Sequence, residues 1–273
     1  MKKQLLILLF SLGFISNAFA TAQEPHILIY KGERLALLGN PLFALYGNSK
    51  PDFLKKFTFG DTGCWDGYIA YWEIIGQQLY LTNIVSCSFS NVKADLKQAF
   101  GDKCINGKVK ADWVTQSLLA GKGGIVYYVH TAWESSWKTE LEFTLDQGIL
   151  KKVTIYDNSK AKQPSRMGDM ELMQLLYSKI NWSVMDALPK SDRQAKVLLR
   201  ISADRNGIID SVEVIRRKVP MILEKEAVRA VKALQEWDVY YKRGKYTRVY
   251  WTMPVTFSEE LRKRYSTRQQ SDK

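Results

Sequence analysis

The sequence is poor in the residues on which many enzymes and metal sites depend. Its 273 residues include two histidines, His26 and His130, and three cysteines, Cys64, Cys87 and Cys104. The cysteines are widely spaced and form no CxxC pair, which argues against a Cys/His zinc site. Two histidines leave little scope for general base catalysis, and a Gly-x-Ser-x-Gly motif is absent. We predict no metal, no cofactor and no enzymatic activity.

An enzyme remains the alternative on other groups. Cys64 would be its nucleophile, although no histidine lies near it in the sequence. The carboxylates Asp61, Asp66 and Glu73 would be the acid/base candidates, acting on a glycan. In an oxidising compartment two of the three cysteines would instead form a disulfide. The spacing does not decide which two, and one thiol is left over.

Long apolar runs are also scarce, and the only one stands at the start. Residues 1–20 combine Lys2 and Lys3, an apolar stretch, and the small-residue pattern Ala18-Phe19-Ala20. This arrangement predicts a cleaved secretory signal and a mature chain that begins near Thr21. An uncleaved anchor is the alternative. Beyond this segment no run approaches the roughly 20 residues that a membrane span needs. We therefore expect a soluble periplasmic protein without a membrane span in the mature chain.

Positive charge is concentrated in the second half of the chain. Residues 21–160 contain 15 Lys and Arg against 14 Asp and Glu, a net of +1, whereas residues 161–273 contain 23 against 14, a net of +9. An exported protein seldom meets nucleic acid, so we expect none as a partner. Acidic protein surfaces, anionic lipid head groups and phosphorylated glycolipids are the candidate partners, with charge contributing attraction and on-rate. A basic surface that serves only solubility is the alternative.

The patterning predicts two domains joined at residues 158–168, a polar stretch with Pro164. The first, residues 21–157, contains short apolar runs separated by turn residues, typical of strands. We expect hairpins at Gly76-Gln77 and at Asp146-Gln147-Gly148. A helix is expected over residues 91–100, with Asn91 as its N-cap and Gly101 as its stop. The second domain spans residues 169–258, and a basic flexible tail follows at 259–273.

Aromatic residues are abundant in the first domain. A cluster of exposed rings, such as Trp65, Tyr71 and Trp72, would stack on sugars and make this domain a glycan-binding or small-ligand module. We expect instead that most of the rings fill a core, since strands favour aromatic residues. The full set is Trp65, Tyr68, Tyr71, Trp72, Tyr80, Tyr127, Tyr128, Trp133 and Trp137.

The second domain has the clearest pattern in the chain. Two alternating apolar runs within residues 196–215 meet at the turn formers Asp204, Asn206 and Gly207, which predicts a hairpin. An amphipathic helix is expected over residues 221–237, after Pro220 ends the second strand. A third strand is expected over residues 246–257. Pro254 lacks a backbone donor, so this strand should lie near a sheet edge.

This succession of elements resembles the C-terminal domain of the TonB family. The resemblance covers about residues 171–257 and includes the preceding helix, residues 171–181. No single position is diagnostic, but their order is. The positions that match the family pattern are Gly207, Val212, Val214, Ala227, Val231, Trp237, Gly244, Pro254 and Phe257. The resemblance implies helices packed on a three-stranded antiparallel sheet. Together with the mostly-β N-terminal domain that the patterning predicts, the chain is expected to be an α+β protein.

In the family, this domain binds a short peptide of an outer-membrane transporter by adding it to the sheet as an extra strand, which requires a free edge. The resemblance therefore implies an envelope protein, such as an outer-membrane transporter or its peptide, as the partner. The predicted edge residues are Tyr246, Arg248, Val249, Tyr250, Trp251 and Thr252. A basic contact is predicted at Arg216, Arg217, Lys218, Lys242, Arg243 and Lys245.

The chain departs from the family pattern in two places, Trp182-Ser183 and Asp238-Val239, where the family often has prolines. We expect these departures to leave the fold intact and to bear on which partner is bound. An energy transducer also needs a membrane anchor and a long, commonly Pro-rich spacer. The whole sequence has seven prolines and no Pro-rich run. We therefore expect a periplasmic adaptor of the Gram-negative envelope, associated with transport, with a TonB-type transducer as the alternative if residues 1–20 remain as an anchor.

Overall fold

The computed structural model describes residues 22–47, 49–58, 61–88, 92–163, 169–215, 219–234 and 236–271. The predicted signal segment lies outside these residues. The chain divides into two compact units, and the division runs through three strands. Unit 1 holds most of residues 22–154, while unit 2 holds residues 155–271 together with 122–127 and 136–140. Both units mix helices and strands, which confirms the predicted α+β class.

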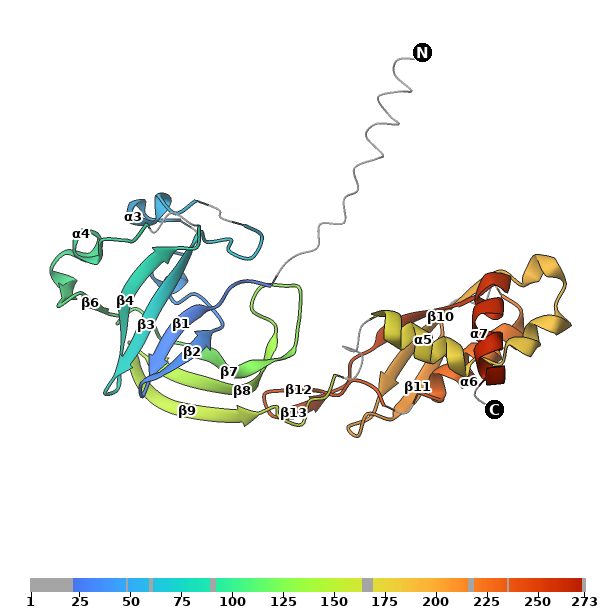
Figure 1. The fold of residues 1–273 in the computed structure, drawn as a ribbon. Coiled ribbons are helices and arrows are strands. Elements are labelled where there is room, and N and C mark those ends of the chain that lie inside the picture. Colours follow the sequence, from blue (N-terminus) through green and yellow to red (C-terminus); the bar gives the residue numbers. More distant parts are fainter. Residues whose placement is uncertain are drawn as a thin grey trace, which may run out of the picture. The chain divides into compact units, whose positions relative to one another are not determined.

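Unit 1 is built on a nine-stranded sheet with the order β3-β1-β2-β7-β8-β9-β4-β6-β5. β3 also pairs with β4, so the sheet closes on itself (Figure 1). β1 and β3 are parallel, whereas β1 and β2 are antiparallel. The strands are β1 (His26–Tyr30), β2 (Glu33–Leu37), β3 (Tyr68–Ile75), β4 (Gln78–Ser86), β5 (Cys104–Ile105), β6 (Lys108–Lys110), β7 (Ser117–Tyr127), β8 (Ser136–Asp146) and β9 (Ile149–Asp157).

Both predicted hairpins of unit 1 are confirmed. β3 and β4 are joined through Gly76, which has a φ of 63°. β8 and β9 are joined through Gln147 and Gly148, with φ of 48° and 71°. A Cβ on Gly148 would lie 2.4 Å from the Ala111 oxygen, so this position requires glycine.

The helix predicted over residues 91–100 begins later than expected. α4 (Leu96–Phe100) is capped by Asp95, whose carboxylate accepts the Gln98 N–H, and ends at Gly101 as predicted. Asn91, the predicted cap, lies outside the described residues. Val92 and Ala94 are not helical because their backbones bond to β4, at Ser86 and Ile84. The remaining short helices of unit 1 are α2 (Phe43–Tyr46), α3 (Asp52–Lys55) and η1 (Gly101–Lys103), none of them predicted.

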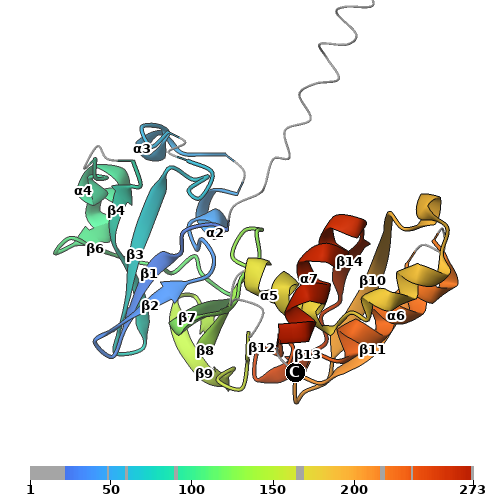
Figure 2. The same ribbon diagram turned by 45° about the vertical axis from the view of Figure 1, so that its right-hand side comes forward.

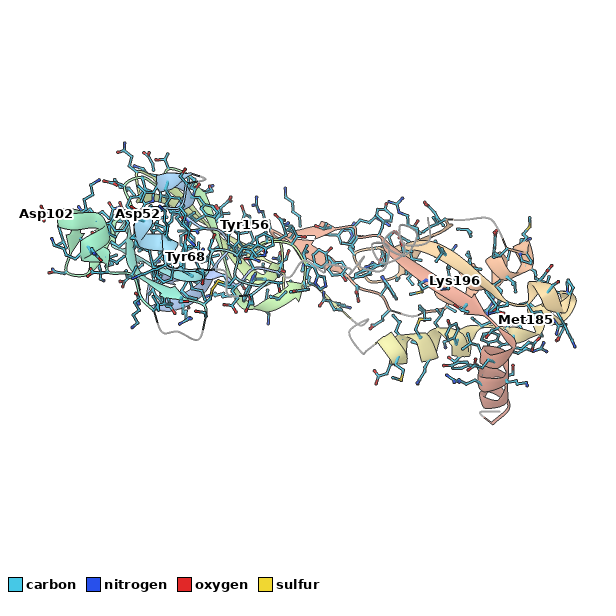
Figure 3. All side chains as sticks on the ribbon, turned by 90° about the horizontal axis from the view of Figure 1, so that it is seen from above. Asp52, Tyr68, Asp102, Tyr156, Met185 and Lys196 are labelled. Atoms are coloured by element: carbon cyan, nitrogen blue, oxygen red, sulfur yellow. A yellow bond between two sulfur atoms is a disulfide. The ribbon has the colours of Figure 1, made fainter. Side chains whose placement is uncertain are left out.

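A disulfide joins Cys64 and Cys87 and leaves Cys104 as a buried thiol. The two cysteines flank the β3–β4 hairpin at its open end, where Tyr68 pairs with Ser86. The disulfide therefore fixes the open end of the β3–β4 pairing, and this pairing closes the sheet. Beneath it lies the apolar core of the unit, and Figure 3 shows Tyr68 among the densely placed side chains here.

Unit 2 contains the predicted three-stranded antiparallel sheet, in the order β11-β10-β14. The alternating residues Val197, Leu199 and Ile201 of β10 are fully buried against the helices, which lie alongside the strands in Figure 2. The elements are α5 (Asp169–Lys179), η3 (Trp182–Ala187), η4 (Lys190–Asp192), β10 (Ala195–Ala203), β11 (Ile209–Val214), α6 (Met221–Lys232), β12 (Tyr240–Lys242), β13 (Lys245–Thr247), β14 (Trp251–Phe257) and α7 (Glu259–Ser271).

Helix α6 is shorter than the predicted helix 221–237. It ends at Lys232, and Trp237 donates its backbone N–H to the Gly207 oxygen at 2.8 Å. Trp237 is buried against the β10–β11 turn, a position that a continuing helix would not give it.

Residues 259–271 form helix α7, where a flexible tail was expected. The helix is strongly polar, but Tyr265 is only 5% exposed and its ring stacks on Trp182 at 6.4 Å. Tyr265 also contacts Tyr177, and Leu261, one turn earlier, packs on the same core. These two apolar residues, four apart, dock the helix together with the ion pair between Arg262 and Asp186.

Part of the predicted linker 158–168 is held by hydrogen bonds. Lys162 and Val239 exchange two backbone hydrogen bonds of 2.9 Å, and the Asn158 amide donates to the Trp137 oxygen at 2.8 Å. Residues 164–168 lie outside the described part of the chain. Among the helices that the structure describes, none combines the length and apolar character needed to cross a membrane.

Candidate functional site

β14 lies at one edge of the three-stranded sheet, because β10 is its only partner in the described structure. Its register sets Leu199 opposite Met253 and Leu198 opposite Pro254. On the other side of β10, the Ile215 N–H donates to the Leu198 oxygen. The backbone N–H and C=O groups of Leu198 therefore face β11, and those of Leu199 face β14. By the alternation of an antiparallel ladder, Thr252, Pro254 and Thr256 direct their backbone groups away from the sheet.

These three residues present few donors to a new strand. The Thr252 N–H has no partner among the described residues, and Pro254 has no N–H. The Thr256 N–H donates to the Tyr177 hydroxyl at 3.4 Å. The β14 edge thus offers one free donor, at Thr252, together with outward carbonyl oxygens. An edge with one donor suits a short added segment.

The opposite edge, β11, differs. By the same alternation, Val212 and Val214 turn their N–H groups away from β10, and neither is blocked by a described residue. β11 contains no proline. The sheet therefore has two edges of different hydrogen-bonding capacity, which provides an internal control for experiments.

The strand predicted over residues 246–257 is two strands, and this corrects the predicted edge. Tyr246 belongs to β13, and Arg248, Val249 and Tyr250 lie between β13 and β14. Only Trp251 and Thr252 of the predicted edge set lie in β14. The cause is a second hairpin, β12–β13, in which Tyr241 pairs with Tyr246. Its tight turn uses Arg243 and Gly244 with φ of 50° and 70°.

The hairpin β12–β13 also carries the described part of the predicted basic set. Lys242, Arg243 and Lys245 surround its turn, and the last two are exposed. The turn backbone is anchored: Arg243 donates its N–H to Glu140 at 3.2 Å, and Gly244 donates to Asn158 at 2.8 Å. Arg216, Arg217 and Lys218 lie outside the described residues.

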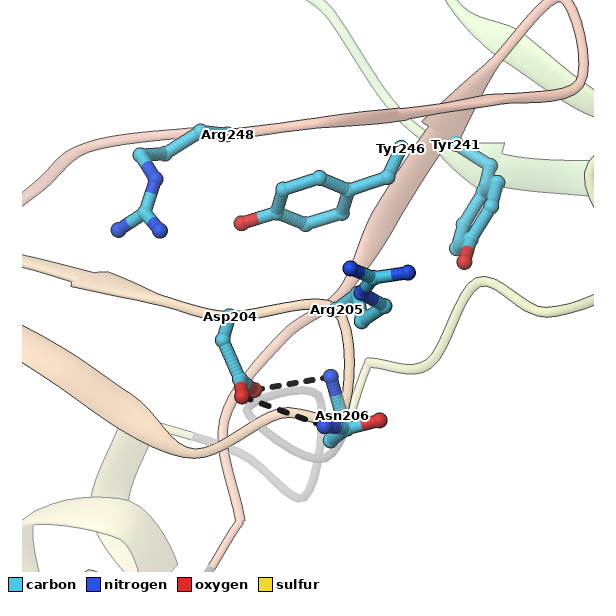
Figure 4. Close-up of a pocket in the computed structure, with 6 residues that line it drawn as sticks. All are labelled: Asp204, Arg205, Asn206, Tyr241, Tyr246 and Arg248. Atoms are coloured by element: carbon cyan, nitrogen blue, oxygen red, sulfur yellow. Dashed lines mark hydrogen bonds between the residues drawn. The ribbon is translucent and has the colours of Figure 1, made fainter.

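A pocket of about 610 Å³ lies where the β10–β11 turn meets this hairpin. Asp204 shapes the turn by accepting the N–H groups of Asn206 and Ile208 at 2.8 and 2.9 Å, bonds that hold its pKa below the usual value. Arg205 is exposed and makes no hydrogen bond or ion pair with the described residues. Arg205 lines the pocket together with Tyr241 and Tyr246 (Figure 4).

The second arginine of the pocket is neutralised locally. Arg248 binds both carboxylate oxygens of Asp210, at 2.6 and 2.7 Å, and donates to the Ser202 hydroxyl at 2.8 Å. These bonds raise the pKa of Arg248 and lower that of Asp210. Arg205 is therefore the uncompensated cation of the pocket. It shares the pocket lining with two tyrosines, and its guanidinium suits a carboxylate or another anionic group. The sequence signal missed here was the arginine inside the Asp-x-Asn-Gly turn.

The predicted features of unit 1 are dispersed. Trp72 is fully buried, whereas Trp65 is 50% exposed, so Trp65, Tyr71 and Trp72 do not form the exposed cluster that the glycan-binding alternative required. Glu73 pairs with Lys108 at 2.6 Å, and Asp61 accepts the Gly63 N–H within its own turn. Cys64 is bound in the disulfide. The described residues contain no group of three His, Cys, Asp or Glu side chains able to hold a metal ion.

Comparison with protein families places the edge and the pocket in a known type of domain. Residues 187–258 match the family described as Gram-negative bacterial TonB protein C-terminal. This match confirms the resemblance inferred from the residue pattern, and it ends just after β14. No curated protein and no solved structure matches the chain significantly. A domain of this type indicates a TonB-like role in protein interaction in the bacterial envelope.

Proposed function

We propose that the protein is an exported periplasmic adaptor whose C-terminal domain binds an extended segment of an envelope protein by adding it to the edge of β14. The observation that carries the proposal is the free backbone edge at Thr252 in a domain that matches the TonB C-terminal family. Backbone bonds would supply affinity in this mode, and side-chain pockets would supply specificity. An outer-membrane transporter or its peptide is the partner class that the family suggests.

The pocket around Arg205 would contribute specificity. Ile201 pairs with Trp251, so the turn that follows Ala203 and the start of β14 lie at the same end of the sheet. A segment laid along β14 therefore has one terminus close to the unpaired guanidinium. An acidic residue at that terminus complements Arg205, together with the exposed Arg243 and Lys245.

The test compares residues that have a backbone N–H with proline, which has none. Thr252→Pro removes the one free outward donor of β14, whereas Thr252→Ala keeps it. Neither change touches the bonds between β14 and β10, which use the alternate residues. The tagged full-length protein is incubated with envelope extract, and captured proteins are identified by mass spectrometry. We expect Thr252→Ala to retain the captured set and Thr252→Pro to lose it.

Val212→Pro supplies the matched control at the other edge, because Val212 also points its N–H outward. This variant should capture the same proteins as the wild type. Recovery of an unchanged set by Thr252→Pro would refute strand addition at β14. Loss with Val212→Pro alone would assign capture to β11. Trp251→Pro is unsuitable, because the Trp251 N–H belongs to the ladder with Ile201.

A further inference from the structure

A second pocket, of about 450 Å³, lies within unit 1. It is lined by one helix, the segment after it and the start of β3. The lining residues are Phe43, Tyr46, Gly47, Lys50, Asp66 and Tyr68. Its size falls within the range of small-molecule sites, roughly 300 to 1,000 Å³. Tyr68 belongs to the aromatic set noted in the sequence of the first domain, whereas Phe43 and Tyr46 do not.

Asp66 is presented by a loop that has little freedom to move. The loop is bridged by the Cys64–Cys87 disulfide, and the Trp65 N–H donates to Gln23 at 2.8 Å. Gly67 has a φ of 76°, and a Cβ there would lie 2.3 Å from the Thr58 oxygen. The loop therefore holds the Asp66 carboxylate at a fixed position, as a binding site requires.

This carboxylate is partly buried, and the effect of burial on it outweighs the attraction of the nearby Lys50 ammonium. Oδ2 accepts the Asn40 amide at 2.8 Å, and burial raises the pKa of Asp66. His26 Nε2 lies 3.8 Å from Oδ2 and has no hydrogen-bond partner among the described residues. Because His26 Nδ1 accepts the Ala70 N–H, its hydrogen is on Nε2 and the ring is neutral. Placing a carboxylate in this setting costs free energy, which a ligand that donates to it would offset.

The two tyrosines add a hydroxyl hydrogen for a ligand. Tyr68 accepts the Asn40 amide at 2.8 Å, and the Tyr46 and Tyr68 hydroxyls are 2.6 Å apart. Two hydroxyls that share one hydrogen bond use one of their two hydrogens. The other hydrogen is available to an acceptor in the pocket. The site thus offers both an acceptor, Asp66, and a donor.

Lys50 and Phe43 favour a neutral ligand with an apolar face over a cationic ligand. The Lys50 ammonium donates to the backbone oxygens of Phe57 and Asp66, the latter at 2.9 Å, so a positive charge is fixed beside the carboxylate. That charge disfavours a cationic ligand. Phe43 is 44% exposed on the rim and offers an apolar ring face. An apolar face with hydroxyl donors and acceptors but without net charge describes a sugar ring.

We infer that the pocket formed by Phe43, Tyr46, Lys50, Asp66 and Tyr68 binds a neutral sugar, with hydroxyl groups on Asp66 and Tyr46 and a C–H face on Phe43. This site is independent of strand addition at β14. Its function would be to attach the adaptor to a glycan while the C-terminal domain holds its protein partner.

The test uses ligand-observed saturation-transfer NMR on the full-length protein. The probes are methyl β-D-glucopyranoside, N-acetylglucosamine and choline. We expect transfer to at least one of the two sugars and none to choline. Asp66→Asn should weaken that binding by about tenfold, because a neutral amide accepts hydroxyl bonds less strongly. The Asn40 amide can still donate to the side-chain oxygen that this variant retains, so the pocket floor is kept.

Trp65→Ala is the matched control, because Trp65 is an exposed aromatic residue on the same loop but outside the pocket lining. It should leave sugar binding unchanged, whereas Phe43→Ala should weaken it. Binding of choline alone, or of no probe, would overturn the inference. Loss of sugar binding in Trp65→Ala with full binding in Asp66→Asn would overturn it as well. Retained melting temperatures separate these outcomes from misfolding.

Discussion

The two units solve the problem of exposed strand edges in opposite ways. In unit 1, the pairing of β3 with β4 closes the sheet, and the strand at its free end, β5, has two residues. In unit 2, β11 and β14 have no strand partner on their outer sides among the described residues. Unpaired backbone is a template for another chain. A ligand of unit 1 would therefore have to be bound by side chains, whereas unit 2 also has unpaired backbone groups available.

The polar clusters of the two units follow the same division. Asp66 in unit 1 is a partly buried carboxylate within a hydrogen-bonded group of side chains. Arg205 in unit 2 is an exposed cation beside a sheet edge. A buried group selects by shape and hydrogen bonding, whereas an exposed charge mainly provides attraction. The two sites should therefore respond differently to the same perturbations.

The largest expected effect on stability comes from removing the Cys64–Cys87 disulfide of unit 1. The variant Cys64→Ser/Cys87→Ser opens a bridge between cysteines separated by 23 positions. In the chain-entropy account, such a loop contributes about 3 kcal/mol to the free energy of unfolding. We expect that loss in unit 1, together with the loss of sugar binding at Asp66. Hydrogen exchange monitored by mass spectrometry resolves the two units.

The same measurement tests whether the units are independent. Exchange in β10 and β14 should remain as in the wild type, and capture of the envelope partner should persist. Reduction of the wild-type protein should reproduce the variant. Equal loss of protection in both units would show that the comparison between a closed and an open sheet has no functional meaning.

A second contrast concerns pH, because both histidines of the chain lie in unit 1. His26 is 2% exposed, and burial lowers its pKa from 6.5 to about 3. Between these values the unfolded state binds a proton that the folded state does not, so stability falls as pH falls. From pH 6.5 to about 5 the loss should approach 2 kcal/mol at 1.36 kcal/mol for each pH unit.

Asp66 is the charged group that faces His26, and the attraction does not outweigh burial at their separation of 3.8 Å. Urea unfolding at several pH values, read by hydrogen exchange in β1 and β10, gives the two slopes. His26→Gln retains an acceptor for the Ala70 N–H and should abolish the slope in unit 1. A slope that persists in this variant would assign the pH dependence to another group.

Local pattern was sufficient to predict those elements whose partners are near in sequence. The hairpins at Gly76 and Gly148, the three-stranded sheet and the core of α6 follow from alternation, turn residues and helical spacing. Helix α7 was also within reach, since Leu261 and Tyr265 have the spacing of one helix face. Its highly polar composition hid that signal.

Contacts between residues that are distant in the sequence could not be predicted from local pattern. The pocket around Asp66 depends on Asn40, 26 positions away, and the disulfide could not be chosen among three cysteines. The division of residues 246–257 into β13 and β14 depends on the β12–β13 hairpin and on Arg248, which binds Asp210 38 positions away. The alternation of apolar residues does not indicate where this segment divides into two strands. The free donor at Thr252 became apparent only from the strand register.

The smallest expected effect is on the affinity of the β14 edge for an added strand, and it tests how far along β14 that strand extends. Tyr177→Phe removes the hydroxyl that accepts the Thr256 N–H and leaves the ring that contacts Trp182 and Tyr265. The freed N–H becomes a second donor for an added strand. A net hydrogen bond of about 0.5 kcal/mol, at the low end because it replaces a bond to water, corresponds to roughly a twofold gain in affinity.

Tyr265→Phe is the matched control, because it removes a hydroxyl from the same aromatic cluster without a described bond to the edge. Calorimetric titration of both variants with the segment captured by the wild type gives the comparison. Tighter binding by Tyr177→Phe alone means that the segment extends past Pro254 to Thr256. Equal binding by the two variants confines it to the neighbourhood of Thr252, and weaker binding by Tyr177→Phe contradicts strand addition at this edge. The length of the bound segment thus follows from a single hydroxyl group.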